Sequence, residues 1–448
     1  MKDLKQIEQY TSYTKYKDSG IEWLGKIPEH WKVSRIEYVA NKTLNSIDTK
    51  DMKGKELFYY DIPTVQSVND GRLENGDNIE SNKYKLKGGE VLISKLNPRK
   101  KTVVLTEKKK QDIVCSTEFV PFYPKKIMGK YLYYILSNSK LADYYNSFVK
   151  SATNSHQRVE PAIISKTKIP VPPLDEQRLI ADFLDYKTSQ IDAIIKEKEQ
   201  LIEHLQEYRQ AIINEAVTKG LSPETTKMKD SGVDGIGEIP KHWTIERLKY
   251  FVKMIGGGTP SKENKDFWDG EIPWVSPKDM KSDFIETTED KITWEGLKNS
   301  STTLIEREAV LVVIRSGILK HSLPVAINKI PVTLNQDMKA LISQRYVKTE
   351  YLAWLLKGLS AYILFNCKKI GATVDSIEIE YLNMLQVPIP PMEEQISIIK
   401  YLKKHTESIN NLIKEVNYQI EKLREYRESL ICEAVTGKID VRGFRKGE

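Results

Sequence analysis

The chain has 448 residues, more than a single hydrophobic core usually accommodates, so two or three domains are expected. Hydrophobic residues make up 40% and charged residues 29%, which is typical of globular rather than disordered proteins, and the net charge of +7 alone excludes little. The N-terminal residues 1–10 are polar, which argues against a signal peptide, and no apolar run reaches the roughly 20 residues of a membrane span. Three scattered cysteines argue against a disulfide framework and a cysteine zinc site, so we expect a cytoplasmic protein.

The opening segment of the chain occurs twice. Residues 17–20 (KDSG) recur at 229–232, and Ile27-Pro28-Glu29-His30-Trp31 recurs as Ile239-Pro240-Lys241-His242-Trp243, both with an offset of 212. The stretch PVPPLDEQ at 170–177 recurs as PIPPMEEQ at 388–395, with an offset of 218. So many ordered matches indicate a tandem duplication, and the repeated His–Trp pair is expected to be a packing element rather than a catalyst.

The first middle segment, roughly 40–150, is dissimilar in sequence to the second, roughly 250–370. Residues 90–94 are predicted to form a buried strand and residues 131–136 a helix face. Residues 81–170 hold 18 basic and 6 acidic residues, a net charge of +12, which suggests a phosphate-rich partner, although the charge alone fits a solvated lysine surface equally well. Side chains able to contact phosphates or base edges in this half are Lys95, Asn97, Arg99, Lys100, Lys101, Thr153, Asn154, His156 and Arg158, and each could instead lie in a solvated loop.

A long helix is predicted after each proline-rich stretch. Residues 178–217 would be about 60 Å long at ~1.5 Å per residue, and apolar residues recur at heptad spacing, interrupted by Lys187 and Lys198 in the first copy and by His405 and Gln419 in the second. Such a stripe needs a partner, and the other copy is the obvious one. The expected stripe residues are Leu184, Ile191, Ile194, Leu201, Leu205, Tyr208 and Ile212, with Leu402, Ile409, Leu412, Val416, Leu423, Tyr426 and Leu430 in the second copy.

The second middle segment, roughly 250–370, is also mixed, with a predicted strand at 309–314 and a predicted helix face at 351–356. The glycine run 256–258 lacks the spacing of a phosphate-binding loop, so it is either a loop that lets backbone approach DNA or a plain turn. Asp283, Glu289 and Lys291 only faintly resemble a nuclease site, and no histidine set has metal-ligand spacing. The candidate DNA-binding residues of this half are Gly257, Thr259, Ser261, Lys278, Arg315, Ser316, Lys320 and Thr373.

Several segments together resemble the specificity subunits of type I restriction-modification systems. They are the opening frame at 17–31, GGGTPS at 256–261, IPWV at 272–275, IRSG at 314–317, NQDMK at 335–339, PPLDEQ at 172–177 and EAVTGKIDVRG at 433–443. The second copy departs from the first at 234–237, where Glu-Trp-Leu is missing, which weakens that local match alone.

The resemblance implies an α+β fold with an internal pseudo-twofold repeat, in which two mixed α/β target-recognition domains are joined by two long helices packed as an antiparallel coiled coil. The first recognition domain would occupy 1–175 and the second 221–390, with spacer helices at 176–220 and, with the C-terminal tail, at 391–448. Antiparallel pairing would place Lys198 near Gln419 and Leu201 near Val416.

The resemblance also implies a subunit without catalytic residues, metal or cofactor, which reads a bipartite, asymmetric double-stranded DNA site. Its partners would be two methyltransferase subunits, which methylate adenine with S-adenosylmethionine, and two restriction/translocase subunits, which use ATP and magnesium. Two alternatives remain open: a catalytic nuclease or methyltransferase, and a coiled-coil scaffold without DNA contact.

Overall fold

The computed structural model describes residues 10–149, 157–306, 308–344, 346–369, 371 and 373–445. The chain divides into two compact units, which share the two long helices: unit 1 consists of Met1–Lys198 and Asn417–Glu448, and unit 2 of Glu199–Val416. Within the described ranges, no helix combines the length and apolar character that a membrane crossing requires. The four-part division by function remains a prediction.

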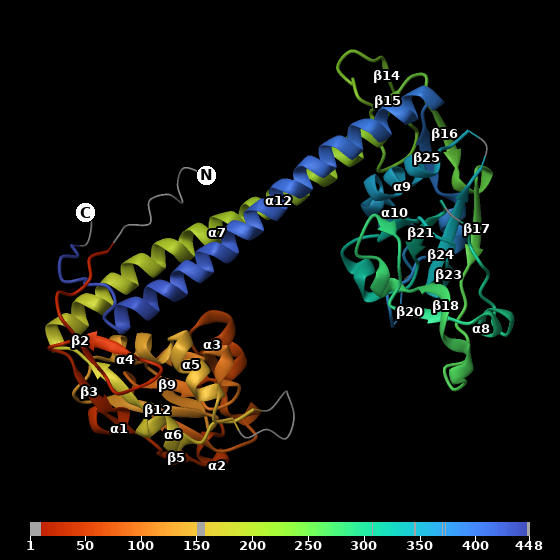
Figure 1. Cartoon of the computed structure of the whole chain (residues 1–448). Helices are drawn as coiled ribbons and strands as arrows, with labels where there is room; N and C mark the ends of the chain where they lie inside the picture. The colour runs from red at the N-terminus through yellow and green to blue at the C-terminus, as the bar shows by residue number, and fades with distance from the viewer. Residues whose placement is uncertain are drawn as a thin grey trace. The chain divides into compact units, whose positions relative to one another are not determined.

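Unit 1 holds two main sheets (Figure 1). The four-stranded sheet has the order β10-β9-β12-β4 and is antiparallel throughout, and the five-stranded sheet has the order β5-β8-β11-β6-β7 with one parallel pair, β11 and β6. The predicted strand at 90–94 and helix face at 131–136 are confirmed as β9 and α4. The bounds are β1 Tyr16–Asp18, β2 Lys26–Pro28, β3 Lys32–Arg35, α1 Ile36–Val39, β4 Ala40–Lys42, β5 Ser46–Ile47, α2 Thr49–Met52, β6 Glu56–Tyr60, α3 Ile62–Val68, β7 Arg72–Asn75, β8 Lys83–Leu86, β9 Val91–Ser94, β10 Val103–Leu105, β11 Asp112–Ser116, β12 Phe119–Pro124, α4 Gly129–Leu136, α5 Ser139–Asn146, α6 Pro161–Lys166 and β13 Lys168–Val171.

Unit 2 repeats the first of these sheets and differs in the second. Its five-stranded sheet has the order β17-β24-β21-β22-β19, in which β22-β21-β24-β17 corresponds to β10-β9-β12-β4, whereas the remaining sheet has only the three strands β20-β18-β23. The strand predicted at 309–314 and the helix face at 351–356 are confirmed as β21 and α9. The bounds are β14 Met228–Asp230, β15 Glu238–Pro240, β16 Thr244–Arg247, β17 Val252–Gly256, β18 Trp268–Val275, β19 Phe284–Ile285, β20 Asp290–Ile292, α8 Trp294–Lys298, β21 Val310–Val313, β22 Val325–Asn328, β23 Thr333–Leu334, β24 Met338–Ser343, α9 Thr349–Gly358, α10 Ser360–Cys367, α11 Ile379–Met384 and β25 Gln386–Ile389.

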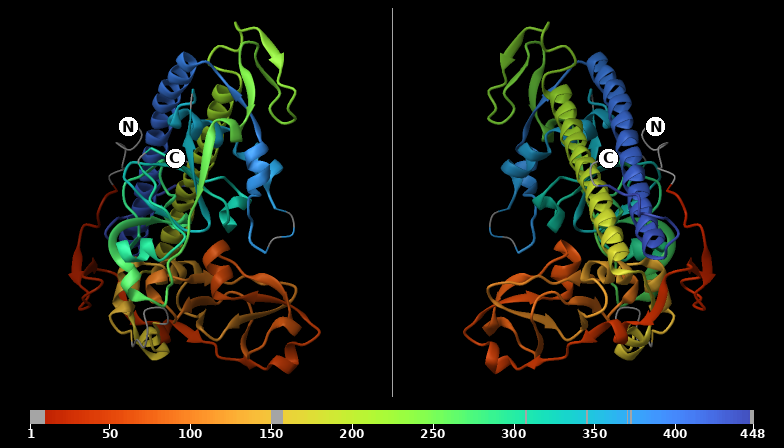
Figure 2. Two further views of the ribbon diagram at one scale, coloured as in Figure 1. Left: turned by 90° about the vertical axis from the view of Figure 1, so that its right-hand side faces the viewer. Right: turned by 90° about the vertical axis from the view of Figure 1, so that its left-hand side faces the viewer.

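The two long helices are α7 (Leu174–Thr218) and α12 (Met392–Val435), which run side by side in Figure 2. Their direction follows from contacts in unit 1, where Asp192 pairs with Arg427 and Lys198 with Gln419, so rising numbers on α7 meet falling numbers on α12. The predicted contact of Lys198 with Gln419 is confirmed at 2.7 Å between Nζ and Oε1. The predicted fold class, with its duplicated mixed domains and antiparallel helices, is confirmed.

A repeated glutamine holds the first turn of each long helix in place. Gln177 accepts a hydrogen bond from the backbone N–H of Met128 and donates one to the carbonyl of Pro172. Gln395 does the same with the N–H of Lys348 and the carbonyl of Pro390. Each glutamine therefore fastens the first turn of its helix to its own unit.

The repeated His–Trp pair packs as expected. In unit 1, Glu176 of α7 lies 2.8 Å from Nε2 of His30, accepts a hydrogen bond from the indole N–H of Trp31 at 3.1 Å, and accepts another from the hydroxyl of Tyr13. In unit 2, Glu394 of α12 holds His242 and Trp243 at 2.6 and 2.9 Å. The pair joins the opening frame of each half to its helix.

The buried stripe on the helices differs by one residue from the prediction at several positions. On α7, Leu184, Ile191, Leu205 and Ile212 do face inward, but Ile195 is buried where Ile194 was expected. The same shift occurs on α12, where Leu402, Ile409, Val416 and Leu430 are buried and Ile413 turns inward in place of Leu412. The exposed residues that were wrongly placed in the stripe are Ile194, Leu201, Tyr208 and Leu412, while Leu423 and Tyr426 are half-buried.

The reason for the error is that apolar residues stand in adjacent pairs, such as Ile194-Ile195 and Leu201-Ile202. Either member of a pair satisfies a heptad spacing, so the sequence pattern leaves the choice open. The helices select the second member, which gives a regular alternation of three and four residues. The stripe is not wholly apolar, because it includes Thr188 and Thr406, whose hydroxyls donate to the carbonyls of Leu184 and Leu402.

Candidate nucleic-acid interface

The loops that follow the central strands β9 and β21 occupy the same place in their units. Ser94 pairs with Phe119 in unit 1, as Val313 pairs with Met338 in unit 2. One residue further, the backbone N–H of Lys95 donates to the carbonyl of Glu118 at 2.9 Å, and that of Ile314 donates to the carbonyl of Asp337 at 2.8 Å. The loop beginning at Lys95 is therefore the structural counterpart of the loop beginning at Ile314.

A third segment adjoins this loop in each unit. An isolated antiparallel bridge joins Leu96 to Arg158 in unit 1, and another joins Arg315 to Ser376 in unit 2. Asn97 N–H donates to the carbonyl of Gln157 at 2.7 Å, matching Ser316 N–H to Asp375 at 3.0 Å. The polar stretches before the two proline-rich boundaries thus lie beside the central loops, which brings together candidate residues that are about 60 positions apart.

At this place in each unit an arginine is bound to a carboxylate. In unit 1, Nε and Nη2 of Arg158 both donate to the carboxylate of Glu118 at 3.1 Å. In unit 2, Nε of Arg315 donates to Asp337 Oδ1 at 2.6 Å. The hydrogen bond with Glu118 raises the pKa of Arg158, so this guanidinium is firmly cationic. Glu118 and Asp337 were missed from the sequence, because no acidic residue was expected to take part in DNA contact.

The remaining candidates of unit 1 surround this loop. Lys95 and Asn97 are half-buried, with Asn97 in a left-handed conformation at φ 50°. Arg99 and Lys100 are exposed on the short 3₁₀ helix η3 (Pro98–Lys100). Lys101 hydrogen-bonds with Glu428 of α12, so its ammonium group already has an anionic partner. Thr153, Asn154 and His156 lie outside the described residues.

In unit 2, several candidates line a cleft of about 610 Å³, whose lining includes Thr259, Lys278, Gln336 and Asp337. The hydroxyl of Thr259 donates to Oε1 of Gln336, and Lys278 lies 3.9 Å from Asp290. Gln336 belongs to the NQDMK motif, yet the sequence analysis did not select it as a contact residue. The cleft combines amide, hydroxyl and ammonium groups, the kinds of side chain that read base edges.

The glycine run lies close to other parts of the protein, and its approach to DNA stays a prediction. A Cβ at Gly257 would lie 2.0 Å from the carbonyl oxygen of Asn335, and one at Gly258 would lie 2.2 Å from Oγ of Ser301. The run is therefore glycine because it packs against the protein's own backbone. Ser261, at the end of the loop, accepts the indole N–H of Trp268 with its carbonyl.

The other candidates of unit 2 lie near Arg315. Ser316 precedes the 3₁₀ helix η7 (Gly317–Lys320), at whose exposed end Lys320 stands. Thr373 is exposed, two residues before Asp375. That these positions contact DNA stays a prediction.

The acidic residues that faintly resemble a nuclease site, Asp283 and Glu289, both form ion pairs with lysines. Asp283 binds the ammonium group of Lys357 at 2.7 Å, and Glu289 binds Lys281 at 3.0 Å. Across the described ranges, no cluster of three or more His, Cys, Asp or Glu side chains could hold a metal ion.

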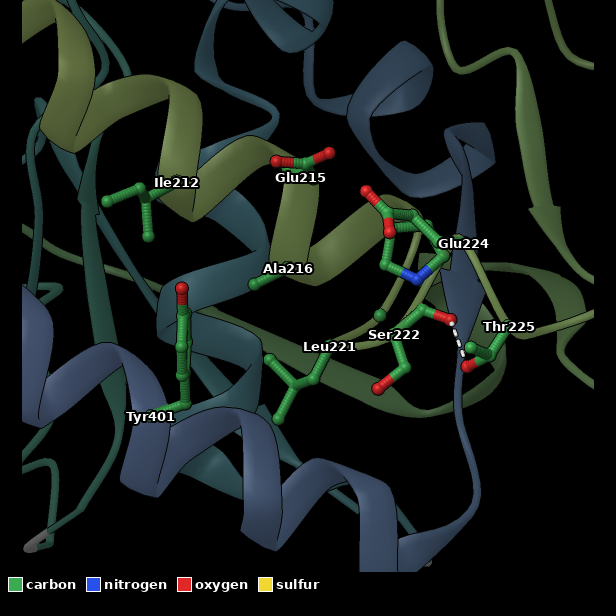
Figure 3. A pocket seen from close by; sticks show the side chains of 10 residues that line it. Ile212, Glu215, Ala216, Leu221, Ser222, Glu224, Thr225 and Tyr401 are labelled. Carbon is green, nitrogen blue, oxygen red and sulfur yellow. Dashed lines mark hydrogen bonds between the residues drawn. The ribbon is translucent and has the colours of Figure 1, made fainter.

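A separate cavity of about 410 Å³ in unit 2 does not suit nucleic acid (Figure 3). It lies between the end of α7 and Tyr401 of α12, and its lining includes the carboxylates of Glu215 and Glu224 but no lysine or arginine. In unit 1 the counterpart of Tyr401 is Phe183, whose ring contacts those of Tyr10 and Phe444, each at 5.2 Å between centroids. Carboxylates repel phosphates, so this cavity is not part of the candidate interface.

Comparisons with known proteins agree with the duplication. The family described as type I restriction modification DNA specificity domain matches residues 28–204 and again 240–422. Over 183 residues, 40% of this chain and 45% of the relative, the chain is 39% identical to the Escherichia coli type I restriction enzyme EcoR124I/EcoR124II specificity subunit. It is 24% identical over 439 residues to the putative type I restriction enzyme MjaX specificity subunit of Methanocaldococcus jannaschii, covering 94% of this chain and 96% of that one.

A solved structure has the same fold. A chain from a study of complex assembly and conformational transition of the type I R-M system matches with a TM-score of 0.71 at 17% identity, covering 92% of this chain and 99% of that one.

Proposed function

The chain belongs to the family of type I restriction-modification DNA specificity domains, and from this premise we propose that it reads a bipartite, asymmetric site on double-stranded DNA for a type I complex. The observation that carries the proposal is the repeated loop surface. Both units present the same strand-end frame, but the side chains on it differ, with Asn97, Arg99 and Arg158 in one and Arg315, Lys320 and Gln336 in the other. Two unlike surfaces on equivalent frames suit two unlike half-sites.

The chain itself performs no catalysis in this proposal. Two methyltransferase subunits bind it and methylate adenine with S-adenosylmethionine, and two restriction subunits supply ATP- and magnesium-dependent cleavage. The ion pairs of Asp283 and Glu289 support this division, because the acidic residues that most resembled a nuclease site already neutralise lysines.

A methyl-transfer experiment tests the proposal against both alternatives. The purified chain alone should give no methylated or cleaved DNA with magnesium, ATP and S-adenosylmethionine, and adding the methyltransferase subunits should give adenine methylation at specific sites. Product from the chain alone would indicate an enzyme, and a complex that shows no salt-dependent DNA binding would indicate a scaffold.

A further inference from the structure

In both units an arginine meets a carboxylate beside an isolated antiparallel bridge. The arginine, however, comes from a different one of the two bridged segments in each unit. In unit 1 the bridge joins Leu96 to Arg158, and in unit 2 it joins Arg315 to Ser376. The structural counterpart of Arg315 is thus Leu96, while that of Arg158 is Ser376. What the two units share is a guanidinium at this point, not an arginine at one position of the repeat.

A gain in loop stability does not explain why an arginine–carboxylate pair occurs at this place in both units. The side chain of Arg158 is 53% exposed and that of Arg315 is 55% exposed. Exposed ion pairs contribute little to stability because water solvates both charges. The backbone bonds at Lys95 and Ile314 already fasten each loop to the strand beside it.

The hydrogen bonds leave the same edge of each guanidinium available. Arg158 binds Glu118 through Nε and Nη2, and Arg315 binds Asp337 through Nε. Within the described residues, no hydrogen bond engages Nη1 of either arginine, so the end formed by Nη1 and Nη2 can still donate two parallel bonds. Guanine presents two adjacent acceptors, O6 and N7, in the major groove, and arginine meets them in this bidentate way.

The carboxylates hold the guanidinium in a fixed orientation. Asp337 is itself held, since its N–H donates to Oδ1 of Asn335 at 3.0 Å. Exposed cations stand nearby, with Arg99 and Lys100 in unit 1 and Lys320 in unit 2, and these suit the flanking phosphates.

We propose that Arg158 and Arg315 each read a guanine in one half-site, with Glu118 and Asp337 as the residues that position them. This inference rests on the proposed function, because it assumes that each unit contacts base edges. It assigns at least one G·C pair to each half-site, read by unit 1 through Arg158 and by unit 2 through Arg315.

The test uses the complex of the full chain with its methyltransferase subunits, and compares Arg158→Ala, Arg315→Ala and Asp337→Asn with Arg72→Ala. Arg72 of β7 is a matched control, because it is a half-exposed arginine that likewise pairs with carboxylates, those of Asp61 and Glu74, and it is not part of the bridge. Sequencing of methylated DNA should show that each of the two loop arginine variants loses discrimination at one guanine of one half-site, by roughly 10- to 100-fold. Asp337→Asn should relax the same position as Arg315→Ala, and Arg72→Ala should leave the motif unchanged.

A second measurement keeps the wild-type protein and changes the DNA. Replacing each guanine of the site in turn by 7-deazaguanine, which lacks N7, should weaken binding at one guanine in each half-site. The proposal is overturned if no such guanine exists, or if the arginine variants bind all sequences equally more weakly with a salt slope reduced by about one, which marks a phosphate contact. A wild-type complex without any sequence preference would instead refute the proposed function.

Discussion

Removing the carboxylate of Glu176 should destabilise unit 1 far more than removing that of Glu394 destabilises unit 2. Both glutamates accept hydrogen bonds from a repeated His–Trp pair, but only Glu176 also binds Tyr13. The side chain of Glu176 is 7% exposed, whereas that of Glu394 is 40% exposed. Water can therefore replace the carboxylate of Glu394 as a hydrogen-bond acceptor, but it cannot replace that of Glu176.

The magnitude follows from the buried donors left without an acceptor. Glu176→Ala strands the indole N–H of Trp31 and the hydroxyl of Tyr13, both on buried residues, at about 1–3 kcal/mol each. The expected loss is about 2–6 kcal/mol for Glu176→Ala, against about 1 kcal/mol for Glu394→Ala, where solvent reaches the site.

Hydrogen exchange measured by mass spectrometry is the suitable assay, because a chain of two units does not unfold in a single two-state step. Peptides covering 26–35 should lose protection in Glu176→Ala, and peptides covering 238–247 should change little in Glu394→Ala. Equal losses in the two variants would refute the reasoning that burial and the third donor decide the cost.

Three further predictions concern the helices, the glycine run and the basic block. Ile409→Glu buries an unpaired charge and should destabilise unit 2 by about 3–5 kcal/mol. Leu412→Glu, on the exposed side of α12, should be tolerated. If the two variants unfold at the same temperature, the assigned stripe is wrong. Gly257→Ala should lower the melting temperature because its Cβ meets a carbonyl at 2.0 Å, whereas Gly317→Ala, with open space around it, should not. Lys100→Ala should reduce the salt slope of DNA binding by about one, and Lys101→Ala should reduce it less because Lys101 pairs with Glu428; the opposite order would show that DNA breaks this pair.

The architecture could be predicted because the duplication repeats whole motifs. PPLDEQ and PPMEEQ stand at the starts of the two helices, and the buried strands contain the apolar runs VLI at 91–93 and AVLVVI at 309–314. The buried stripe on the helices could be predicted only in part, because either member of an adjacent apolar pair such as Ile194-Ile195 fits the heptad spacing.

The candidate site could be predicted as a set of residues but not as a geometry. Arg158 and Arg315 were both selected, yet their equivalence depends on strand register, because one follows the central strand and the other precedes the proline-rich boundary. Glu118 and Asp337 were missed because an acidic residue is not an obvious DNA contact, and only the folded chain brings each beside an arginine.

The central claim is that two unlike surfaces on one duplicated frame read two unlike half-sites. Sequencing the methylated bases in DNA from cells that carry this chain with its methyltransferase subunits tests that claim most directly. The account predicts adenine methylation within an asymmetric motif of two different half-sites separated by an unread gap. A single continuous motif, or two identical half-sites, would contradict it.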